Sequence, residues 1–167
     1  MVESKSCCFT GHRPKSLPCG YNEESGGFEK LDDAIRAAVV DLCYHGYKRF
    51  YTGMAEGVDI WAAETVLSLT DKFEDLELIA VIPFAEQKNR MTDDFKKRYE
   101  HILDYAAKTI YISNRYTEDC FKKRNYFMVD HSDAVIAVYN PAKWRSGTGQ
   151  TVRYAEARQK RIILIQP

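Results

Sequence analysis

Strand-like and helix-like segments alternate along the whole chain, and this alternation constrains the fold more than any other feature of the sequence. Runs rich in β-branched and aromatic residues predict strands at residues 6–10, 49–52, 77–82, 109–112, 134–139 and 161–165. The last two helices are expected to begin near Asp119 and near Gln150. Elsewhere between the strands, apolar residues recur with helical spacing, for example at Phe28, Leu31, Ile35, Val39 and Leu42.

Parallel neighbouring strands need a crossover segment that returns the chain to the same end of the sheet. The alternation therefore predicts an α/β fold, a Rossmann-like domain whose mostly parallel sheet carries helices on both faces. The chain has 167 residues, and because domains of about 150 residues are common, we expect one domain spanning residues 1–167.

Charge and hydropathy limit the classes of partner. The 24 basic and 24 acidic residues leave no formal net charge, which argues against nucleic acid and against a membrane surface as partners. No run approaches the roughly 18 apolar residues that span a bilayer, and the first residues lack the apolar run of a signal peptide. We therefore expect a cytoplasmic protein; the sequence leaves open whether it forms a homo-oligomer.

Cysteine and histidine spacing gives no indication of a metal centre. The five cysteines contain no C-x-x-C pair, and the four histidines are scattered without zinc-ligand spacing. We expect reduced thiols and no bound metal.

Glycine and polar residues cluster after three of the predicted strands, at residues 10–14, 52–59 and 140–151. The carboxyl ends of parallel strands lie at one edge of a sheet, so these clusters are expected to meet in the crevice where such sheets bind ligands. Glycine-rich turns that lead into a helix offer backbone N–H groups to an anion, which indicates a phosphate-bearing ligand. The candidate ligand-binding residues in these clusters are Gly11, His12, Arg13, Gly53, Gly57, Asp59, Asn140, Ser146, Gly147, Thr148, Gly149 and Thr151.

Several candidates have a structural alternative that the sequence does not decide. Arg13 either forms bidentate hydrogen bonds with phosphate oxygens or is a solvated surface charge. His12 either contacts a base or caps a turn. Asp59 either holds ribose hydroxyls or interacts with the dipole of the helix in which it lies. Arg124 and Asn125, on the penultimate helix, are further candidates that could turn toward the same crevice.

Neither standard phosphate-binding signature is present. Val152 stands where G-x-G-x-x-G requires its last glycine, and no G-x-x-x-x-G-K-[ST] occurs. The sequence therefore gives little support to dehydrogenase chemistry or to P-loop hydrolysis.

Four segments together resemble the YpsA-like branch of the SLOG superfamily: residues 10–14, 53–59, 124–133 and 147–152. That superfamily also contains the Smf/DprA DNA-processing proteins and the LOG phosphoribohydrolases. The resemblance implies a Rossmann-like fold that binds nucleotides or nucleotide-derived ligands. It also implies that Gly11 and Arg13 belong to a first ligand loop, Gly53, Gly57 and Asp59 to a second, and Gly147, Thr148, Gly149 and Thr151 to a phosphate-facing loop.

The chain departs from the LOG hydrolases at the residue that matters for cleavage. Their P-G-G-x-G-T-x-x-E motif ends in a glutamate that serves cleavage of the base-to-ribose bond. Aligning Gly147-Thr148-Gly149 on its G-x-G places Arg153 at that glutamate, while Glu156 comes nearly one turn later. Because general acid/base catalysis needs hydrogen-bond reach to the reacting atom, the position of Glu156 alone does not assign it the role of the missing glutamate.

The leading hypothesis is a nucleotide-binding protein with a sensor or regulatory role, whose ligand is ADP-ribose, NAD or a nucleoside phosphate; no cofactor is assigned. The alternative is a hydrolase of nucleotide N-glycosidic bonds that uses Glu64, Glu56 or Glu156. A third hypothesis, single-stranded DNA binding, is disfavoured by the zero net charge.

Overall fold

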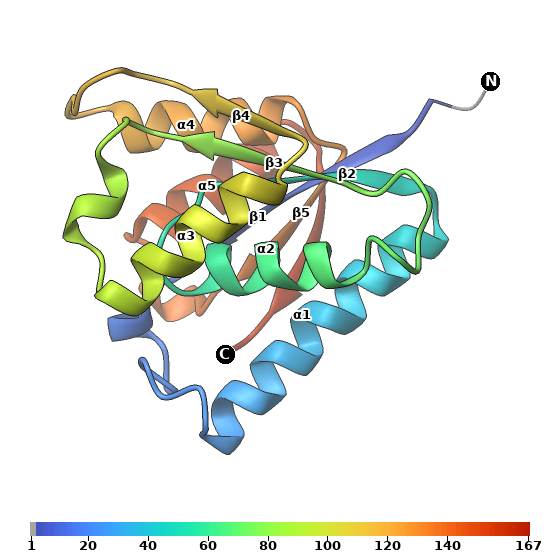
Figure 1. The fold of residues 1–167 in the computed structure, drawn as a ribbon, viewed down its shortest axis with the longest axis horizontal. Helices are drawn as coiled ribbons and strands as arrows, with labels where there is room; N and C mark the ends of the chain where they lie inside the picture. The colour runs from blue at the N-terminus through green and yellow to red at the C-terminus, as the bar shows by residue number, and fades with distance from the viewer. Residues whose placement is uncertain (1–2) are drawn as a thin grey trace.

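The computed structural model describes residues 3–167, and its six strands form a single sheet in the order β4-β3-β2-β1-β5-β6 (Figure 1). Every neighbouring pair is parallel. The strands are β1 (Lys5–Gly11), β2 (Tyr47–Thr52), β3 (Glu77–Ile82), β4 (Lys108–Tyr111), β5 (Ala134–Val138) and β6 (Arg161–Ile165). The predicted α/β, Rossmann-like fold is confirmed.

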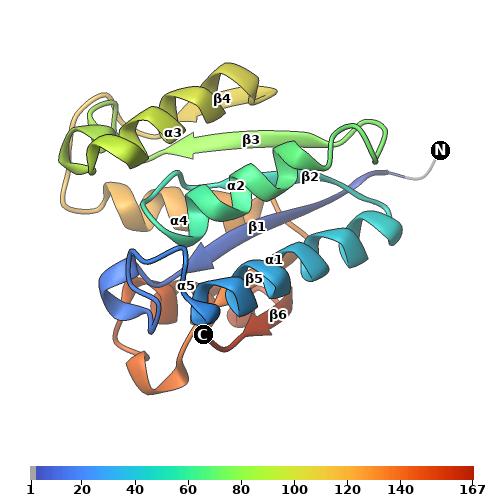
Figure 2. The same ribbon diagram turned by 60° about the horizontal axis from the view of Figure 1, so that its bottom comes forward.

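Helices cover both faces of the sheet. The helices are α1 (Gly26–Tyr44), α2 (Val58–Ser68), α3 (Asp93–Tyr105), α4 (Cys120–Asp130) and α5 (Gly147–Ala157), with short 3-10 turns η1 (Pro14–Ser16), η2 (Gln87–Arg90) and η3 (Pro141–Lys143). α1, α2 and α3 lie on one face, and α4 and α5 lie on the other (Figures 1 and 2). Among residues 3–167, no helix has the length and apolarity needed to span a membrane.

Successive side chains of a strand point to opposite faces of the sheet, so each face of the sheet has its own hydrophobic core. Cys7 and Phe9 of β1 pack in the core beneath α1, α2 and α3, while Cys8 belongs to the core beneath α4 and α5. The rings of Phe9 and Phe50 stack with centroids 5.8 Å apart, and both side chains are fully buried. Burial of each such side chain contributes about 1.5 to 3 kcal/mol, so these central strands anchor the loops at their ends.

Helix caps define where the helices begin. The Thr92 hydroxyl accepts a hydrogen bond from the Phe95 backbone N–H and so caps α3. The expectation that the last helix begins near Gln150 is wrong, because α5 begins at Gly147. The Ser146 hydroxyl accepts a hydrogen bond from the Gly149 N–H at 3.1 Å, so the residues predicted as a loop form the first turn of the helix.

The topology places a crevice above β1. The chain runs outward from β1 through β2, β3 and β4, and then returns to form β5 on the other side of β1. The connections that follow β1 and β5 therefore leave the sheet in different directions. Ligands of open α/β sheets bind at the carboxyl ends of the strands at such a point.

Candidate functional site

Two adjoining cavities open at the carboxyl ends of the strands. The small cavity has a volume of about 190 Å³ and is lined by Phe9, Thr10, Gly11, His12, Arg13, Ser16, Asp59, Phe121, Arg124, Asn125, Ser146, Gly147 and Thr148. The large cavity, of about 320 Å³, is lined by Arg13, Pro14, Lys15, Tyr21, Ala55, Glu56, Phe84, Gln87, Arg90, Met91, Tyr116 and Phe121. Because Arg13 and Phe121 line both, the two cavities meet at these side chains.

The small cavity brings together nine of the fourteen residues that the sequence singled out. These come from the end of β1, from α2, from α4 and from the start of α5: Gly11, His12, Arg13, Asp59, Arg124, Asn125, Ser146, Gly147 and Thr148. The expected convergence of distant clusters at one sheet edge is thus present. That these residues bind a ligand stays a prediction.

Three of the glycines lie behind the cavity walls, where close packing requires the absence of a side chain. A Cβ atom at Gly53 would meet the Arg124 guanidinium, and one at Gly149 would lie 2.7 Å from the Trp144 carbonyl carbon. Gly57 has a φ of 92° at the N-cap of α2, where a Cβ would lie 2.9 Å from Pro14 Cδ. Their places in the structure are explained by contacts within the chain.

Asn140 and Thr151 also make contacts within the chain and line neither cavity. The Asn140 side-chain oxygen accepts a hydrogen bond from the Ala142 N–H at 3.0 Å and so caps η3. The Thr151 hydroxyl donates to the Gly147 carbonyl oxygen at 2.9 Å, which supports the first turn of α5.

Arg124 places a buried cation at the floor of the small cavity. The side chain is only 3% exposed; its Nε donates to the Asn125 side-chain oxygen at 2.7 Å, and its terminal nitrogen donates to the Gly53 carbonyl oxygen. Burial lowers the pKa of Arg124 to about 10, while the nearby Asp59 carboxylate opposes this shift. Arg124 is therefore still protonated at neutral pH.

Asp59 is the acidic partner of this floor. Burial raises the pKa of its carboxyl group, and the charges of Arg124 and Arg13 oppose the rise. Its Oδ2 accepts a hydrogen bond from the Ala55 backbone N–H at 3.2 Å. This contact stabilises the turn between β2 and α2, and a role of Asp59 in holding ribose stays a prediction.

Arg13 and the first turn of α5 supply free donors. Within residues 3–167 the exposed Arg13 guanidinium has no hydrogen-bond or ion-pair partner, and it lies 5.9 Å from the centre of the Phe121 ring. The Gly147 and Thr148 N–H groups likewise find no acceptor in this part of the chain, as expected for the first turn of a helix. Since a Cβ at Gly147 would meet nothing within 4 Å, the backbone there is open to a ligand.

His12 acts as a hydrogen-bond acceptor for the backbone. Its Nε2 accepts the Asn140 N–H at 3.0 Å, and the imidazole lies 5.7 Å from the Tyr139 ring. Burial lowers the pKa of His12, and the positive charge of Lys143 lowers it further. The structure therefore favours the turn-capping alternative for this residue.

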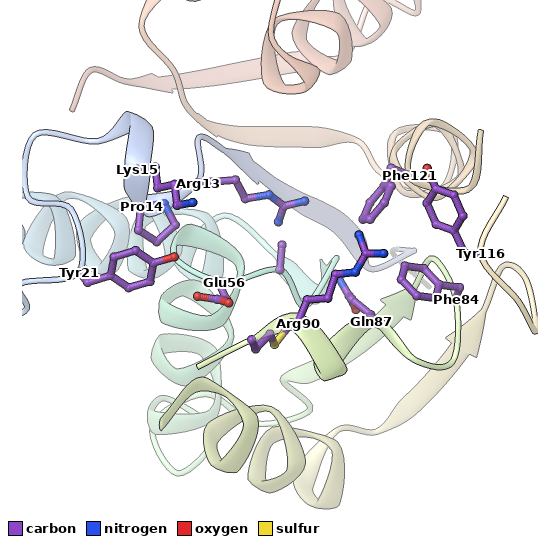
Figure 3. A pocket seen from close by; sticks show the side chains of 12 residues that line it. Arg13, Pro14, Lys15, Tyr21, Glu56, Phe84, Gln87, Arg90, Tyr116 and Phe121 are labelled. Atoms are coloured by element: carbon purple, nitrogen blue, oxygen red, sulfur yellow. The ribbon is translucent and has the colours of Figure 1, made fainter. Parts of the chain in front are cut away.

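The large cavity contains an aromatic cluster that the sequence analysis missed. Phe84, after β3, makes edge-to-face contacts with Tyr116 and Phe121 at ring-centroid distances of 5.6 and 5.8 Å. Figure 3 shows these rings on one side, Tyr21 and Glu56 on the other, and the guanidinium groups of Arg13 and Arg90 between them. Phe84 follows the end of β3 and so lies at the same edge of the sheet, but no glycine cluster marks its segment in the sequence.

Of the three glutamates considered for hydrolysis, only Glu56 lines a cavity. Glu64 accepts hydrogen bonds from Arg98, the shortest at 2.6 Å, and Glu156 is exposed on α5. Arg153, which replaces the hydrolase glutamate, donates to the Trp144 carbonyl oxygen.

Arg98 fixes the segment that carries Tyr21. Its guanidinium binds Glu23 of this segment at 2.6 Å, Glu64 of α2 at 2.6 Å and Asp94 of α3 at 3.1 Å. Within residues 3–167, His, Cys, Asp and Glu side chains form no group of three suited to a metal ion.

The comparisons with known proteins agree with this architecture. The family model described as the "YspA SLOG family" matches residues 7–167. The chain belongs to this YpsA family. A UPF0398 protein of Bacillus cereus (strain ATCC 14579) is 31% identical over 141 residues, covering 83% of this chain and 76% of the relative. A UPF0398 protein of Bacillus thuringiensis (strain Al Hakam) is 32% identical over 141 residues, which again cover 83% of this chain and 76% of the relative.

A solved structure of DNA processing protein A from Helicobacter pylori shares the fold of this YpsA-family chain. Its TM-score is 0.65 at 19% identity, and the match covers 98% of this chain and 66% of that one. The YpsA-family chain thus spans about two thirds of that protein, which is described by its single-stranded DNA binding mode.

This match corrects the expectation against nucleic acid as a partner. That expectation relied on the zero net charge, and it is wrong because a protein that shares the fold over 98% of the YpsA-family chain binds single-stranded DNA. Net charge averages over the whole molecule, whereas Arg13 and Arg124 are concentrated at one edge of the sheet.

Proposed function

We propose that the chain binds a nucleotide or a nucleotide-derived ligand in a sensing or regulatory role, with phosphate in the small cavity and the base in the large cavity. The observation that carries this proposal is that a donor-rich cavity and an aromatic cavity meet at Arg13 and Phe121. A nucleotide has the same division, with an anionic end and a planar apolar end.

The small cavity suits a phosphate group. Arg13 offers a free guanidinium fork, and the Gly147 and Thr148 N–H groups add backbone donors at the positive end of α5. Arg124 adds a second positive charge, against a single carboxylate at Asp59. The balance of charge and donors favours an anion.

The large cavity suits a base. Its volume of about 320 Å³ is at the lower end of the range for small-molecule pockets. Phe84, Tyr116 and Phe121 offer ring surfaces, and stacking of one base on an aromatic side chain contributes about 1 to 3 kcal/mol. ADP-ribose, NAD and nucleoside phosphates all contain a base and a phosphate that these two cavities could take.

The test is calorimetric titration of the full chain with nucleoside monophosphates, ADP-ribose and NAD, repeated with Arg13→Ala. Loss of a hydrogen bond to a charged group costs about 1.5 to 3 kcal/mol, so the variant should bind about 10- to 150-fold more weakly at an unchanged melting temperature. Arg36→Ala is the matched control, because Arg36 is exposed on α1 and lines neither cavity. If none of these compounds binds at millimolar concentration, the proposal fails.

A second candidate function, binding of a single nucleic-acid strand, is favoured by the surface beside the small cavity. Trp144 is 52% exposed, and the guanidinium carbons of Arg145 and Arg153 lie 4.8 and 5.6 Å from its ring centre. The sequence contains no acidic residue from 134 to 155. An exposed ring among cations is the kind of surface on which the bases of a strand stack.

Fluorescence anisotropy with a labelled oligothymidylate separates the two candidates. Strand binding should weaken with salt and should weaken again in Trp144→Ala, while mononucleotide affinity stays the same. Tyr105→Ala, which removes an exposed ring from α3, is the control. An oligonucleotide that binds wild type and Trp144→Ala equally contradicts the strand-binding candidate.

A further inference from the structure

We infer that the large cavity is specific for guanine and that Glu56 is the residue that determines this specificity. The inference rests on the proposed nucleotide binding and extends it to the identity of the base. It starts from one atom of Glu56 that has no partner.

Glu56 presents an unsatisfied acceptor in the cavity. Its Oε2 is buried and has no hydrogen-bond partner within residues 3–167. The Tyr21 hydroxyl interacts with the same carboxylate, and burial together with this carboxylate raises the pKa of Tyr21. A buried polar atom without a partner costs about 1 to 3 kcal/mol, more when charged, so a ligand that supplies N–H donors gains by satisfying it. Figure 3 shows the Tyr21 hydroxyl pointing toward this carboxylate, which therefore borders the space between the two walls.

The Gln87 amide also lines the cavity, and its hydrogen-bonding groups are already used within the chain. Gln87 donates from Nε2 to the Gly53 carbonyl oxygen at 3.0 Å, and its Oε1 lies 3.5 Å from the Tyr99 hydroxyl that donates to it. Arg13 and Arg90 have no hydrogen-bond or ion-pair partner within the described residues. Glu56 is thus the acidic side chain of the lining, Arg13, Lys15 and Arg90 are its cations, and Tyr21 and Tyr116 add hydroxyl groups.

Guanine complements this set of groups better than any other common base. Its N1–H and its N2 amino group are adjacent donors that one carboxylate accepts together, while O6 and N7 are acceptors that an arginine binds in a fork. Adenine and cytosine each offer a single amino group, and uracil and thymine a single N–H, so none satisfies the carboxylate twice. The aromatic wall would stack any base and adds no preference among them.

The first measurement is calorimetric titration of the full chain with GMP, IMP and AMP. A good bidentate pair contributes about 1 to 3 kcal/mol of discrimination, so GMP should bind about 5- to 150-fold more tightly than AMP. IMP lacks the N2 amino group and should fall between them. Equal affinities for GMP and AMP would overturn the guanine inference but leave nucleotide binding intact, whereas no binding of any nucleotide would overturn the proposed function itself.

The second measurement exchanges the hydrogen-bonding pattern. In Glu56→Gln the side-chain oxygen accepts N1–H while the new amide donates to a base oxygen at position 2, which xanthine has and guanine lacks. The variant should therefore lose its preference for GMP, gain affinity for XMP and keep its affinity for AMP. Glu156→Gln, an exposed change on α5, should leave all three affinities unchanged.

A third arm tests whether Glu56 instead holds the ribose. The guanine inference expects dGMP to bind as tightly as GMP, because the contact lies on the base. If dGMP binds much more weakly and Glu56→Gln weakens all ribonucleotides equally, the carboxylate accepts from the ribose diol and the guanine inference is wrong. Thermal unfolding of Glu56→Gln confirms that the variant used is folded.

Discussion

Arg124 occupies the space that a side chain at Gly53 would need, and its guanidinium donates to the carbonyl oxygen of that same glycine. A Cβ at Gly53 would lie 2.7 Å from the Arg124 Cζ atom and 2.9 Å from its Nε. The turn after β2 and the middle of α4 are thus fitted to each other through one buried cation.

Gly53→Ala should displace this guanidinium, lowering both the free energy of unfolding and nucleotide affinity. The two positions should also be coupled: in the Arg124→Met background the stability cost of Gly53→Ala should shrink by about 0.5 to 3 kcal/mol, since the obstructing group is gone. Denaturant unfolding of the four proteins measures this coupling. Gly26→Ala, where a Cβ meets nothing within 4 Å, is the control; additive costs for Gly53 and Arg124 would contradict the prediction.

Gly149→Ala should destabilise the domain. The new Cβ would lie 2.7 Å from the Trp144 carbonyl carbon and 3.0 Å from its Cα, and this backbone cannot move aside as a flexible side chain does. Overpacking of this kind costs about 1 to 3 kcal/mol. Gly147→Ala makes the same chemical change two residues earlier in an open position and should keep the stability of wild type. Chemical denaturation compares them; equal stability of the two variants would refute the packing role of Gly149.

Incubation with nucleoside monophosphates should release little free base. Arg153 stands where the hydrolases carry glutamate, Glu64 is paired with Arg98, and Glu156 is exposed outside both cavities. Chromatography of the reaction mixture measures the release. If base appears over many turnovers, Glu56 becomes the candidate acid or base, and Glu56→Gln should then lower the rate by at least about 100-fold.

Stability should fall in weak acid because of His12. The Asn140 N–H bond needs an unprotonated Nε2, and burial lowers the pKa of His12 in the folded state. This contribution is therefore complete above the unfolded value of about 6.5 and is lost as the pH falls below it.

The pH dependence of the unfolding free energy in His12→Gln tests this effect. Between about pH 7 and pH 5 the unfolding free energy of the variant should fall less steeply than that of wild type, because the variant lacks the His12 imidazole that binds a proton on unfolding. His101→Gln, which removes an exposed imidazole from α3, should leave the slope unchanged. Identical slopes for wild type and His12→Gln would show that His12 does not control acid stability.

The sequence predicted the sheet and the edge that bears the site because both depend on local patterns. The strand predicted at residues 134–139 follows from short-range periodicity, and β5 forms there. Convergence of Gly11, Asp59 and Gly147 followed from the rule that parallel strands end at one edge.

The aromatic wall was not predictable in the same way. Phe84, Tyr116 and Phe121 come from three segments without glycine clusters, and only tertiary packing makes them neighbours. Gly53 and Gly149 could not be told from ligand-facing glycines, since the atoms that exclude a side chain there belong to Arg124 and Trp144. Likewise, a free acceptor on Glu56 is a property of its surroundings rather than of its sequence.

The central position of β1 sets the order in which the domain can be assembled on the ribosome. Cys7 pairs with Phe50 on one side and with Ala134 on the other, so one edge of β1 has no neighbour until β5 has been synthesised. Ser146, Gly147 and Thr148 come later still, and they complete the small cavity. A nascent chain therefore completes the cavity proposed to bind phosphate only late in synthesis, and a ligand bound there would stabilise the folded chain rather than its earlier intermediates.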